Sequence, residues 1–528
     1  MRSSKYVSLS LIATAVVLRV GLIFRYRFDS DEPQHMHVAW GWAHGLAQYR
    51  DVFDNHMPLF HLLSAPLFAF TGDDPRLLFA ARLAMLPLFL GALALVFLIA
   101  RRLFDTTTAW WSAAAAALIP PFFLGSLEYR TDDLWLVLWL GVIAVAVSEL
   151  PLKRKSLYGG LLLGAAFGVS MKSSVFVISI IGALLATFLL TLRRGTLPSS
   201  RTVVRSLLLT LAAALVVPLL ICGAMAAAGL WKDFTYGAFL HNHFPWEHKQ
   251  KVLLFIPLYF IVRAIALRLA RAEGEQEIVR MRLFVFMAAG IYLTIVAAFW
   301  PMTAAETYLP FYPLAALLAA PLLMQRRFLA PAFAVAMLVA IVVTAEPWKN
   351  EANEEIAMVD EVLAITDPAD PVMDLKGETV FRERPYYFVL EAITNVKLRL
   401  GILSDQIADT LVRSRTHVVV GDALPPKARE FVKRHYVEWG RVRVAGARLP
   451  RLHGDATPVE FDLAVPGSYV VIDEDGVLHA TIDGVSVGRD GVMLAAGRHR
   501  LVTAAKSSRA MVIWSGTLRS ARPGRRVL

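Results

Sequence analysis

Apolar stretches of about 20 residues follow one another along the first two thirds of the chain, separated by short polar segments. A helix of this length crosses the hydrocarbon core of a bilayer, whereas one soluble domain cannot bury so much apolar sequence. The pattern predicts a polytopic α-helical membrane protein with about eleven transmembrane helices. These fall at Tyr6–Phe24 and near 78–100, 108–127, 133–150, 157–172, 174–192, 203–228, 252–270, 283–300, 308–325 and 328–346.

Basic residues occupy alternate connections between these stretches, on the side of the N-terminus. Cytoplasmic connections carry an excess of lysine and arginine, so we expect a cytoplasmic N-terminus, and an odd number of spans places everything after residue 347 outside. No small-residue cleavage site follows the first stretch, which predicts an uncleaved anchor in the inner or plasma membrane. The basic connections hold Arg101-Arg102, Lys153-Arg154-Lys155, Arg193-Arg194, Arg271 with Arg280, and Arg326-Arg327.

Composition supports the membrane interpretation. The 528 residues are 56% hydrophobic and 18% charged, whereas soluble proteins are about one quarter charged. The net charge of +11 comes from basic residues at the ends of apolar stretches, so it does not indicate nucleic-acid binding. The single cysteine, Cys222, excludes an intrachain disulfide and disfavours a cysteine-based metal site.

From Trp348 onwards the sequence has the composition of a soluble protein. Residues 1–347 form the predicted transmembrane domain, and 348–452 alternate helical and strand patterns typical of a small extracytoplasmic α/β domain. Residues 453–528 hold short strand patterns between glycine turns, which predict a β-sandwich-like domain. In the α/β domain we expect helices at 355–365, 385–400, 404–414 and 425–439, and strands at 371–381, 416–420 and 441–445.

The predicted outer connection at residues 26–77 carries the first candidate site. Asp31 and Glu32 follow the first span directly. A carboxylate near the membrane surface suits a general base; alternatively, both acids cap the helix that follows. Asp31 and His35 share one helix face, so a divalent metal bound by them is a further interpretation, against histidines that only pack at the interface.

Four more polar features lie on the same predicted side of the membrane. Arg130 and Asp132 occupy a short turn between two spans, where they bind substrate or form a surface pair. Lys172 lies at an outer hairpin, where a cation suits a phosphate, with snorkelling as the alternative. His243 lies in a loop and Tyr308 at the entry of a span, as ligands or as part of an aromatic belt. A transport path would scatter such groups across the bilayer, so their convergence indicates an extracytoplasmic active site.

Five motifs follow one another along the chain in this order: Asp31-Glu32, Phe53-Asp54-Asn55-His56-Met57-Pro58-Leu59-Phe60, Arg130-Thr131-Asp132, Lys172, and Tyr308-Leu309-Pro310. This order resembles the glycosyltransferase C (GT-C) superfamily, and within it the bacterial relatives of protein O-mannosyltransferases and of the aminoarabinose transferase of lipid A. The resemblance covers roughly residues 1–345 and, more loosely, the α/β domain. Met57 departs from the family's usual proline, and the region after 457 is outside the common pattern.

The resemblance implies an inverting glycosyltransferase that takes a sugar from a polyprenyl-phosphate donor and gives it to a glycan, lipid or protein acceptor. Asp31 would accept the proton of the acceptor hydroxyl, with Glu32 beside it. Lys172, with Arg130 or His243, would stabilise the charge of the leaving phosphate. The residues expected to position the substrates are Asp54, His56, Asp132 and Tyr308.

The need for a metal is left open, because the family varies in metal dependence. The candidate ligands of a divalent metal ion are Asp31, His35 and Asp132.

Two other functions fit parts of the sequence. A multi-pass lipid or glycan transporter would have interrupted helices near mid-membrane, for which only Pro120-Pro121 and Pro218 are candidates. A catalytically silent relative would use its C-terminal domains to bind glycan or protein.

Overall fold

A computed structural model describes residues 2–70, 72–192, 199–243, 251–300, 304–326 and 328–520. The chain divides into two compact units. The helical unit consists of Met1–Arg27, Asn55–Ser64 and Phe79–Glu351, and the mixed unit of Phe28–Asp54, Ala65–Leu78 and Ala352–Leu528. The predicted outer connection is therefore shared between both units. Arg193-Arg194, Arg327 and residues 244–250 lie outside the described residues.

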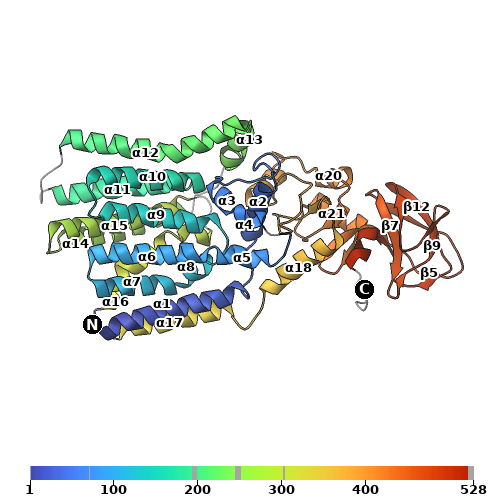
Figure 1. Cartoon of the computed structure of the whole chain (residues 1–528), viewed down its shortest axis with the longest axis horizontal. Helices are drawn as coiled ribbons and strands as arrows, with labels where there is room; N and C mark the ends of the chain where they lie inside the picture. Colours follow the sequence, from blue (N-terminus) through green and yellow to red (C-terminus); the bar gives the residue numbers. More distant parts are fainter. Residues whose placement is uncertain are drawn as a thin grey trace. The chain divides into compact units, whose positions relative to one another are not determined.

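The helical unit is a bundle whose long helices run side by side (Figure 1). Each apolar stretch expected from the sequence contains one helix or two consecutive helices. The long helices are α1 Arg2–Ile23, α6 Leu86–Leu103, α7 Thr106–Leu118, α9 Thr131–Val147, α10 Leu152–Val169, α11 Ser173–Thr191, α12 Ser200–Ala227, α14 Phe255–Ala270, α15 Gln276–Ala298, α16 Phe311–Leu323 and α17 Leu329–Ala345. The short ones are α3 Leu59–Ser64, α5 Leu77–Leu83, α8 Pro120–Gly125, α13 Trp231–Thr235, the π-helix η2 Tyr236–Leu240, and the 3₁₀ helices η3 Lys251–Leu254 and η4 Ala305–Tyr308.

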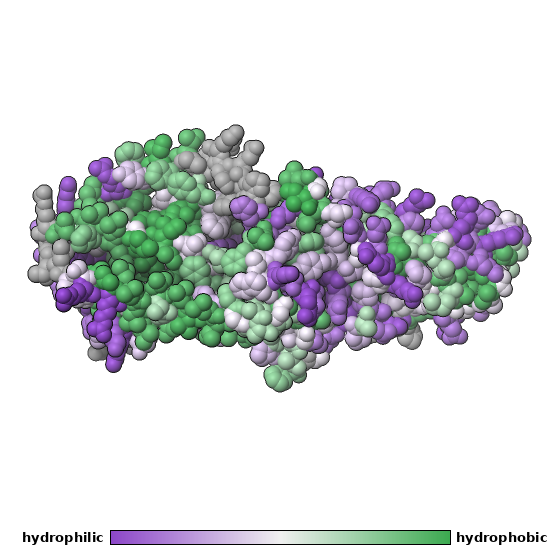
Figure 2. Space-filling view, turned by 90° about the horizontal axis from the view of Figure 1, so that it is seen from above, coloured by the Kyte–Doolittle hydropathy of each residue, from purple (hydrophilic) through white to green (hydrophobic). Residues whose placement is uncertain are grey.

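The face of this bundle that Figure 2 shows is mainly hydrophobic. On α12, for example, Leu207 and Leu208 are 61% and 62% exposed. In the described part of the chain, five helices are long and apolar enough to cross a membrane, and two further apolar helices, α16 and α17, are shorter. Large exposed apolar surfaces of this kind require lipid, so this is a membrane protein. The count of about eleven crossings stays a prediction.

Close packing of α10 against α12 depends on glycines spaced four residues apart. A Cβ atom added at Gly160 would lie 2.5 Å from the carbonyl oxygen of Thr210, and one added at Gly164 only 2.4 Å from that of Ala214. Both contacts are with backbone, which a rotamer change cannot relieve. Small residues at this spacing let the backbones of membrane helices approach closely.

We expect Gly164→Ala to lower the melting temperature of the purified protein, because the new methyl group must push α12 away. Overpacking of this kind costs about 1–3 kcal/mol. Gly159→Ala is the matched control, since its Cβ would meet nothing closer than Val145 Cγ1 at 3.9 Å. Thermal unfolding in detergent that gives the same melting temperature for both variants would contradict this packing.

The mixed unit contains an eight-stranded sheet, a four-stranded sheet and a two-stranded sheet. The first has the order β1-β2-β4-β14-β7-β11, with β3 paired to β4 and β8 to β7; only β1 and β2 are parallel within it. Because β4 (Val442–Arg448) pairs with β14 (Met511–Trp514), this sheet joins the segments predicted as α/β and as sandwich. The other strands of this sheet are β1 Val372–Met373, β2 Val418–Val419, β3 Tyr436–Trp439, β7 Gly467–Asp473, β8 Gly476–Val477 and β11 Val492–Leu494.

The smaller sheets complete a β-rich C-terminal region. The four-stranded sheet has the order β10-β9-β12-β6, and β13 pairs with β5. The strands are β5 Leu452–His453, β6 Val459–Leu463, β9 Ala480–Ile482, β10 Val485–Val487, β12 Gly497–Val502 and β13 Lys506–Ser507, followed by the 3₁₀ helix η5 Ser515–Ser520. The helices of the mixed unit are α2 Asp31–Ala43, α4 Pro66–Ala69, α18 Ala352–Ile365, α19 Ala392–Arg399, α20 Ile407–Arg413 and α21 Pro426–His435.

Three elements of this unit differ from the sequence prediction. The helix expected at 385–400 begins only at Ala392, where the Glu391 carboxylate caps the N–H groups of Ile393 and Thr394. The helix expected through Trp439 ends at His435, because Tyr436–Trp439 pairs with β4 as a strand. The strand expected at 371–381 is limited to Val372–Met373. Beyond it the backbone N–H groups of Gly377 and Thr379 donate to the Asp374 carboxylate instead of to a neighbouring strand.

Candidate functional site

Five charged side chains of the helical unit form what we call the charged cluster: Glu128, Arg130, Asp132, Lys172 and Glu306. Arg130 lies 3.4 Å from Glu128, 3.6 Å from Asp132 and 3.1 Å from Glu306. Its side chain is only 7% exposed, so these carboxylates compensate a buried charge. The predicted neighbours Arg130 and Asp132 are therefore together, and Glu306 is a partner that the sequence prediction missed.

Lys172 completes the charged cluster. Its Nζ lies 3.1 Å from Oδ1 of Asp132, whose side chain is 4% exposed, whereas that of Lys172 is 25% exposed. The same ammonium lies 5.7 Å from the centroid of the Trp135 ring, and the Trp135 indole donates to Ser173 at 2.9 Å. Lys172 is thus a held but accessible cation, which suits an anionic ligand.

The turn from Glu128 to Asp132, which carries three members of the cluster, is fixed from within the bundle by Arg19 on α1. This side chain is fully buried and donates to Phe123 O and Ser126 Oγ, each at 3.0 Å. These acceptors lie at the end of α8 and just after it, directly before the turn. Arg19 is therefore a structural residue that orders the turn from Glu128 to Asp132.

The remaining predicted residues of the helical unit lie on separate loops. His56 is close enough to Asp132 to interact with it electrostatically. Its neighbour Asn55 exchanges hydrogen bonds with Asn242, at 3.2 Å between side chains and 2.8 Å from Asn242 Nδ2 to Asn55 O. His243, the residue after Asn242, is exposed. Tyr308 is the last residue of η4 and is half-buried.

Asp31 is the first residue of α2 and belongs to the mixed unit. Its Oδ1 lies 2.6 Å from Nζ of Lys376, which also donates to Ser30 Oγ at 3.0 Å. The Asp31 side chain is 30% exposed, so a polar ligand can reach this carboxylate. Lys376 lies 345 residues away along the chain and was not among the predicted site residues.

Glu32 has a different environment from its neighbour. It is fully buried, and its Oε1 accepts a hydrogen bond from the backbone N–H of Asp29 at 2.9 Å. The Asp29 carboxylate in turn accepts from the N–H of Asp31 at 3.1 Å. This reciprocal arrangement satisfies N–H groups at the start of α2 in the way a capping box does. The acid that accepts from the first N–H group of α2 is thus Asp29, and Glu32 accepts from the N–H of Asp29.

The loop after β1 holds Lys376 in place. The Asp374 carboxylate accepts from the N–H groups of Gly377 at 2.8 Å and Thr379 at 2.9 Å, and from Arg384 at 2.6 Å. Burial, and then the charge of Asp374, raise the pKa of Glu378 to about 7. The loop therefore has a carboxyl group that titrates near neutral pH two residues from the partner of Asp31.

We expect Glu378 to make the stability of the protein fall as pH rises. Its pKa is raised to about 7 in the folded state from 4.5, so folding is favoured below pH 4.5 and this contribution is lost as pH rises through 7. In thermal unfolding from pH 5 to pH 8, wild type should lose on the order of 2 kcal/mol relative to Glu378→Gln, which stays uncharged. Parallel curves for the two proteins would contradict the raised pKa.

The other predicted residues of the mixed unit are buried. Asp54 is fully buried and accepts hydrogen bonds from Gln48 at 2.6 Å and from Gln34 at 3.5 Å. His35 is 1% exposed. Among the described residues no group of three or more His, Cys, Asp or Glu side chains is arranged to hold a metal ion. His35 and Asp31 belong to the mixed unit and Asp132 to the helical unit.

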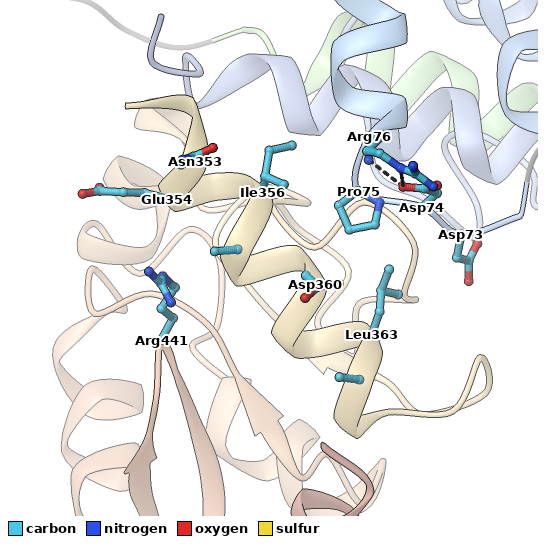
Figure 3. A pocket seen from close by; sticks show the side chains of 12 residues that line it. Asp73, Asp74, Pro75, Arg76, Asn353, Glu354, Ile356, Asp360, Leu363 and Arg441 are labelled. Atoms are coloured by element: carbon cyan, nitrogen blue, oxygen red, sulfur yellow. Dashed lines mark hydrogen bonds and ion pairs between the residues drawn. The ribbon is translucent and has the colours of Figure 1, made fainter. Parts of the chain in front are cut away.

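A cavity of about 830 Å³ lies in the mixed unit between α18 and the segment 73–76 (Figure 3). Asp74 and Arg76 pair with each other there at 2.6 Å, and Asp73 binds Arg382 at 2.8 Å. Glu354 and Asp360 of α18 also line it. None of the predicted site residues is part of its lining.

Comparisons with known proteins identify a matching protein family and solved structures with a similar fold. Residues 55–222 match the family described as dolichyl-phosphate-mannose-protein mannosyltransferase, a range that includes Arg130, Asp132 and Lys172. ArnT from Cupriavidus metallidurans in the apo state aligns with a TM-score of 0.60 at 12% identity, over 84% of this chain and 98% of its own. The chain has the ArnT fold. The resemblance to the GT-C superfamily stated from the motifs is thereby confirmed.

Other comparisons are less close or negative. ArnT bound to undecaprenyl phosphate aligns with a TM-score of 0.58 at 13% identity, over 83% of this chain and 97% of its own. The Archaeoglobus fulgidus oligosaccharyltransferase, tethered with an acceptor peptide, aligns with a TM-score of 0.46 at 12% identity, over 93% of this chain and 76% of its own. No curated protein sequence matches significantly. The family match and the ArnT alignment describe a membrane protein with a glycosyltransferase-like fold.

Proposed function

We propose that the protein is a membrane glycosyltransferase that moves a sugar from a polyprenyl-phosphate donor to an acceptor at the extracytoplasmic face, with inversion at the anomeric carbon. The observation that carries this proposal is Lys172, an accessible cation held by a buried carboxylate at the loop end of the helical unit. The fold shared with ArnT, which has been solved bound to undecaprenyl phosphate, supports a polyprenyl phosphate as the ligand of this cation.

In the proposed reaction the acceptor hydroxyl oxygen attacks the anomeric carbon, and the bond from that carbon to the phosphate oxygen breaks. The bonding electrons leave with the polyprenyl phosphate. The hydroxyl proton passes to the Asp31 carboxylate, which Lys376 orients. Lys172 stabilises the charge that develops on the phosphate, while Asp132 and Arg130 fix the position of Lys172. His56 and Tyr308 remain the proposed positioning residues.

Glu32 and Asp54 take structural roles in this proposal. Both are fully buried and bound by hydrogen bonds within the mixed unit, so they support the segment that carries Asp31. His243 is the exposed candidate for a further contact with the phosphate.

The test is a transfer assay with the full chain in liposomes that contain polyprenyl-phosphate-linked hexoses or pentoses. We expect release of polyprenyl phosphate together with a new glycoside whose anomeric configuration is opposite to that of the donor. Candidate acceptors are supplied as glycan, lipid and peptide fractions. Movement of an intact donor between leaflets without bond cleavage would instead support a transporter and overturn the proposal.

A further inference from the structure

A groove in the helical unit lies at the opposite ends of α9 and α11 from the charged cluster. It has a volume of about 280 Å³ and is lined by α9, α11 and α15. Val147 is the last residue of α9, Thr191 the last of α11, and Arg280 the fifth of α15. The groove therefore opens at the C-terminal ends of α9 and α11 and at the N-terminal end of α15. Asp132 and Ser173 lie at the other ends of α9 and α11.

The polar residues of the groove, Arg280, Thr191 and Thr187, lie toward the helix ends, and apolar residues continue along the helices. Phe284 lies four residues beyond Arg280 on α15, about 6 Å along the axis. Leu184 lies seven residues before Thr191 on α11, about 10 Å along its axis. Leu184 and Phe188 are 53% and 44% exposed on the outside of the helical unit. The lining thus has the polarity profile of a lipid, with a headgroup end and a chain end.

Arg280 is the unusual residue of this groove. Its Nε is buried and has no hydrogen-bond partner among the described residues, and the same holds for Oγ1 of Thr187. Nearby cations are satisfied within the protein: Arg102 pairs with Glu149 at 2.7 Å and with Glu277 at 2.8 Å. A buried donor without a partner costs about 1–3 kcal/mol, so a ligand acceptor is expected at Arg280.

We propose that this groove binds an anionic glycerophospholipid from the leaflet at the Arg280 end. The guanidinium binds the phosphate, the Thr187 hydroxyl donates to an ester carbonyl, and an acyl chain lies along Phe188, Leu184 and Phe284. Basic pockets between transmembrane helices recognise anionic headgroups in this way. By the positive-inside rule this leaflet is the cytoplasmic one, so the site is distinct from the proposed donor site and does not depend on glycosyl transfer.

The proposal is tested by native mass spectrometry of the full chain in detergent with added phosphatidylglycerol. We expect Arg280→Gln to weaken retention of this lipid at least tenfold and Thr187→Val to weaken it less. Arg268→Gln is the matched control. Arg268 is exposed in the last turn of α14 and does not line the groove, so its replacement removes the same charge and leaves the groove unchanged. Arg280→Lys keeps the charge and should retain the lipid.

Two further probes identify the ligand class. Phosphatidylcholine and sn-glycerol 1-phosphate should each bind at least tenfold more weakly than phosphatidylglycerol, because one lacks net charge and the other lacks acyl chains. Equal retention by Arg280→Gln and wild type, or equal loss in Arg268→Gln, would overturn the site. Equal binding of either probe would overturn the assignment to an anionic lipid. If Arg280→Gln does not fold, the other two variants are compared with wild type. Arg280→Lys should retain the lipid and Thr187→Val should retain less of it, and unchanged retention in Thr187→Val overturns the site.

Discussion

Replacement of Asp31 by asparagine should reduce the rate of sugar transfer by about 10²–10⁴-fold, the range that a general base contributes. Asparagine has the same shape but cannot take the proton of the acceptor hydroxyl. The loss should appear in the rate at saturating donor and acceptor, with little change in donor binding. Single-turnover transfer from a labelled donor in liposomes measures it.

Glu32→Gln is the matched control, since it neutralises the adjacent acid in the same way. A glutamine oxygen can still accept the hydrogen bond from the Asp29 N–H that Glu32 accepts at 2.9 Å. We therefore expect this variant to transfer sugar within about threefold of wild type, because Glu32 is buried and its hydrogen bond is kept. Undiminished transfer by Asp31→Asn would remove Asp31 from the mechanism, and equal losses in both variants would point to the start of α2 as a structural requirement.

Lys376→Met separates chemistry from positioning at the same carboxylate. Loss of the 2.6 Å ion pair leaves Asp31 able to accept a proton but no longer fixes its orientation. We expect a rate loss of about tenfold, smaller than that of Asp31→Asn, because orientation contributes less than removal of the base. A loss as large as that of Asp31→Asn would assign Lys376 a direct part in the reaction.

The local features of this protein are readable from its sequence because they depend on neighbours along the chain. Apolar stretches predict helices since a bilayer-spanning segment must satisfy its own backbone hydrogen bonds. The hydrogen bonds of Asp29 and Glu32 at the start of α2 join residues two and three apart, and the turn from Arg130 to Asp132 joins residues only two apart. The fold class could therefore be stated from the sequence.

The site partners were missed for the opposite reason. Lys376 reaches Asp31 across 345 residues, and Glu306 reaches Arg130 from a different helix pair. The pattern of hydrophobic and polar residues along the chain cannot predict such pairings, because they depend on tertiary packing alone. Charge in an otherwise apolar context was the available signal: Glu306 precedes a span, and its partly buried carboxylate compensates the buried charge of Arg130. The pairing of β4 with β14 is non-local in the same sense.

Replacement of Lys172 by methionine should lower kcat/KM for the lipid donor by about 10²-fold, as removal of one stabilising group at a developing anion does. The same change also leaves Asp132 without the cation that lies 3.1 Å from it. Loss of one partner of a buried pair is destabilising, so a lower melting temperature is expected as well. Activity and melting temperature must therefore be measured on the same preparations.

A double-mutant cycle distinguishes the two roles. Asp132→Asn added to Lys172→Met removes the uncompensated carboxylate, so it should recover much of the melting temperature. If Lys172 binds the donor phosphate, transfer stays low in the double variant, whereas Lys172→Arg, which keeps the charge, retains part of it. If the pair serves only to hold α9 and the start of α11 together, activity recovers with stability. Recovery of both would remove Lys172 from the phosphate site and with it the observation on which the proposed reaction depends.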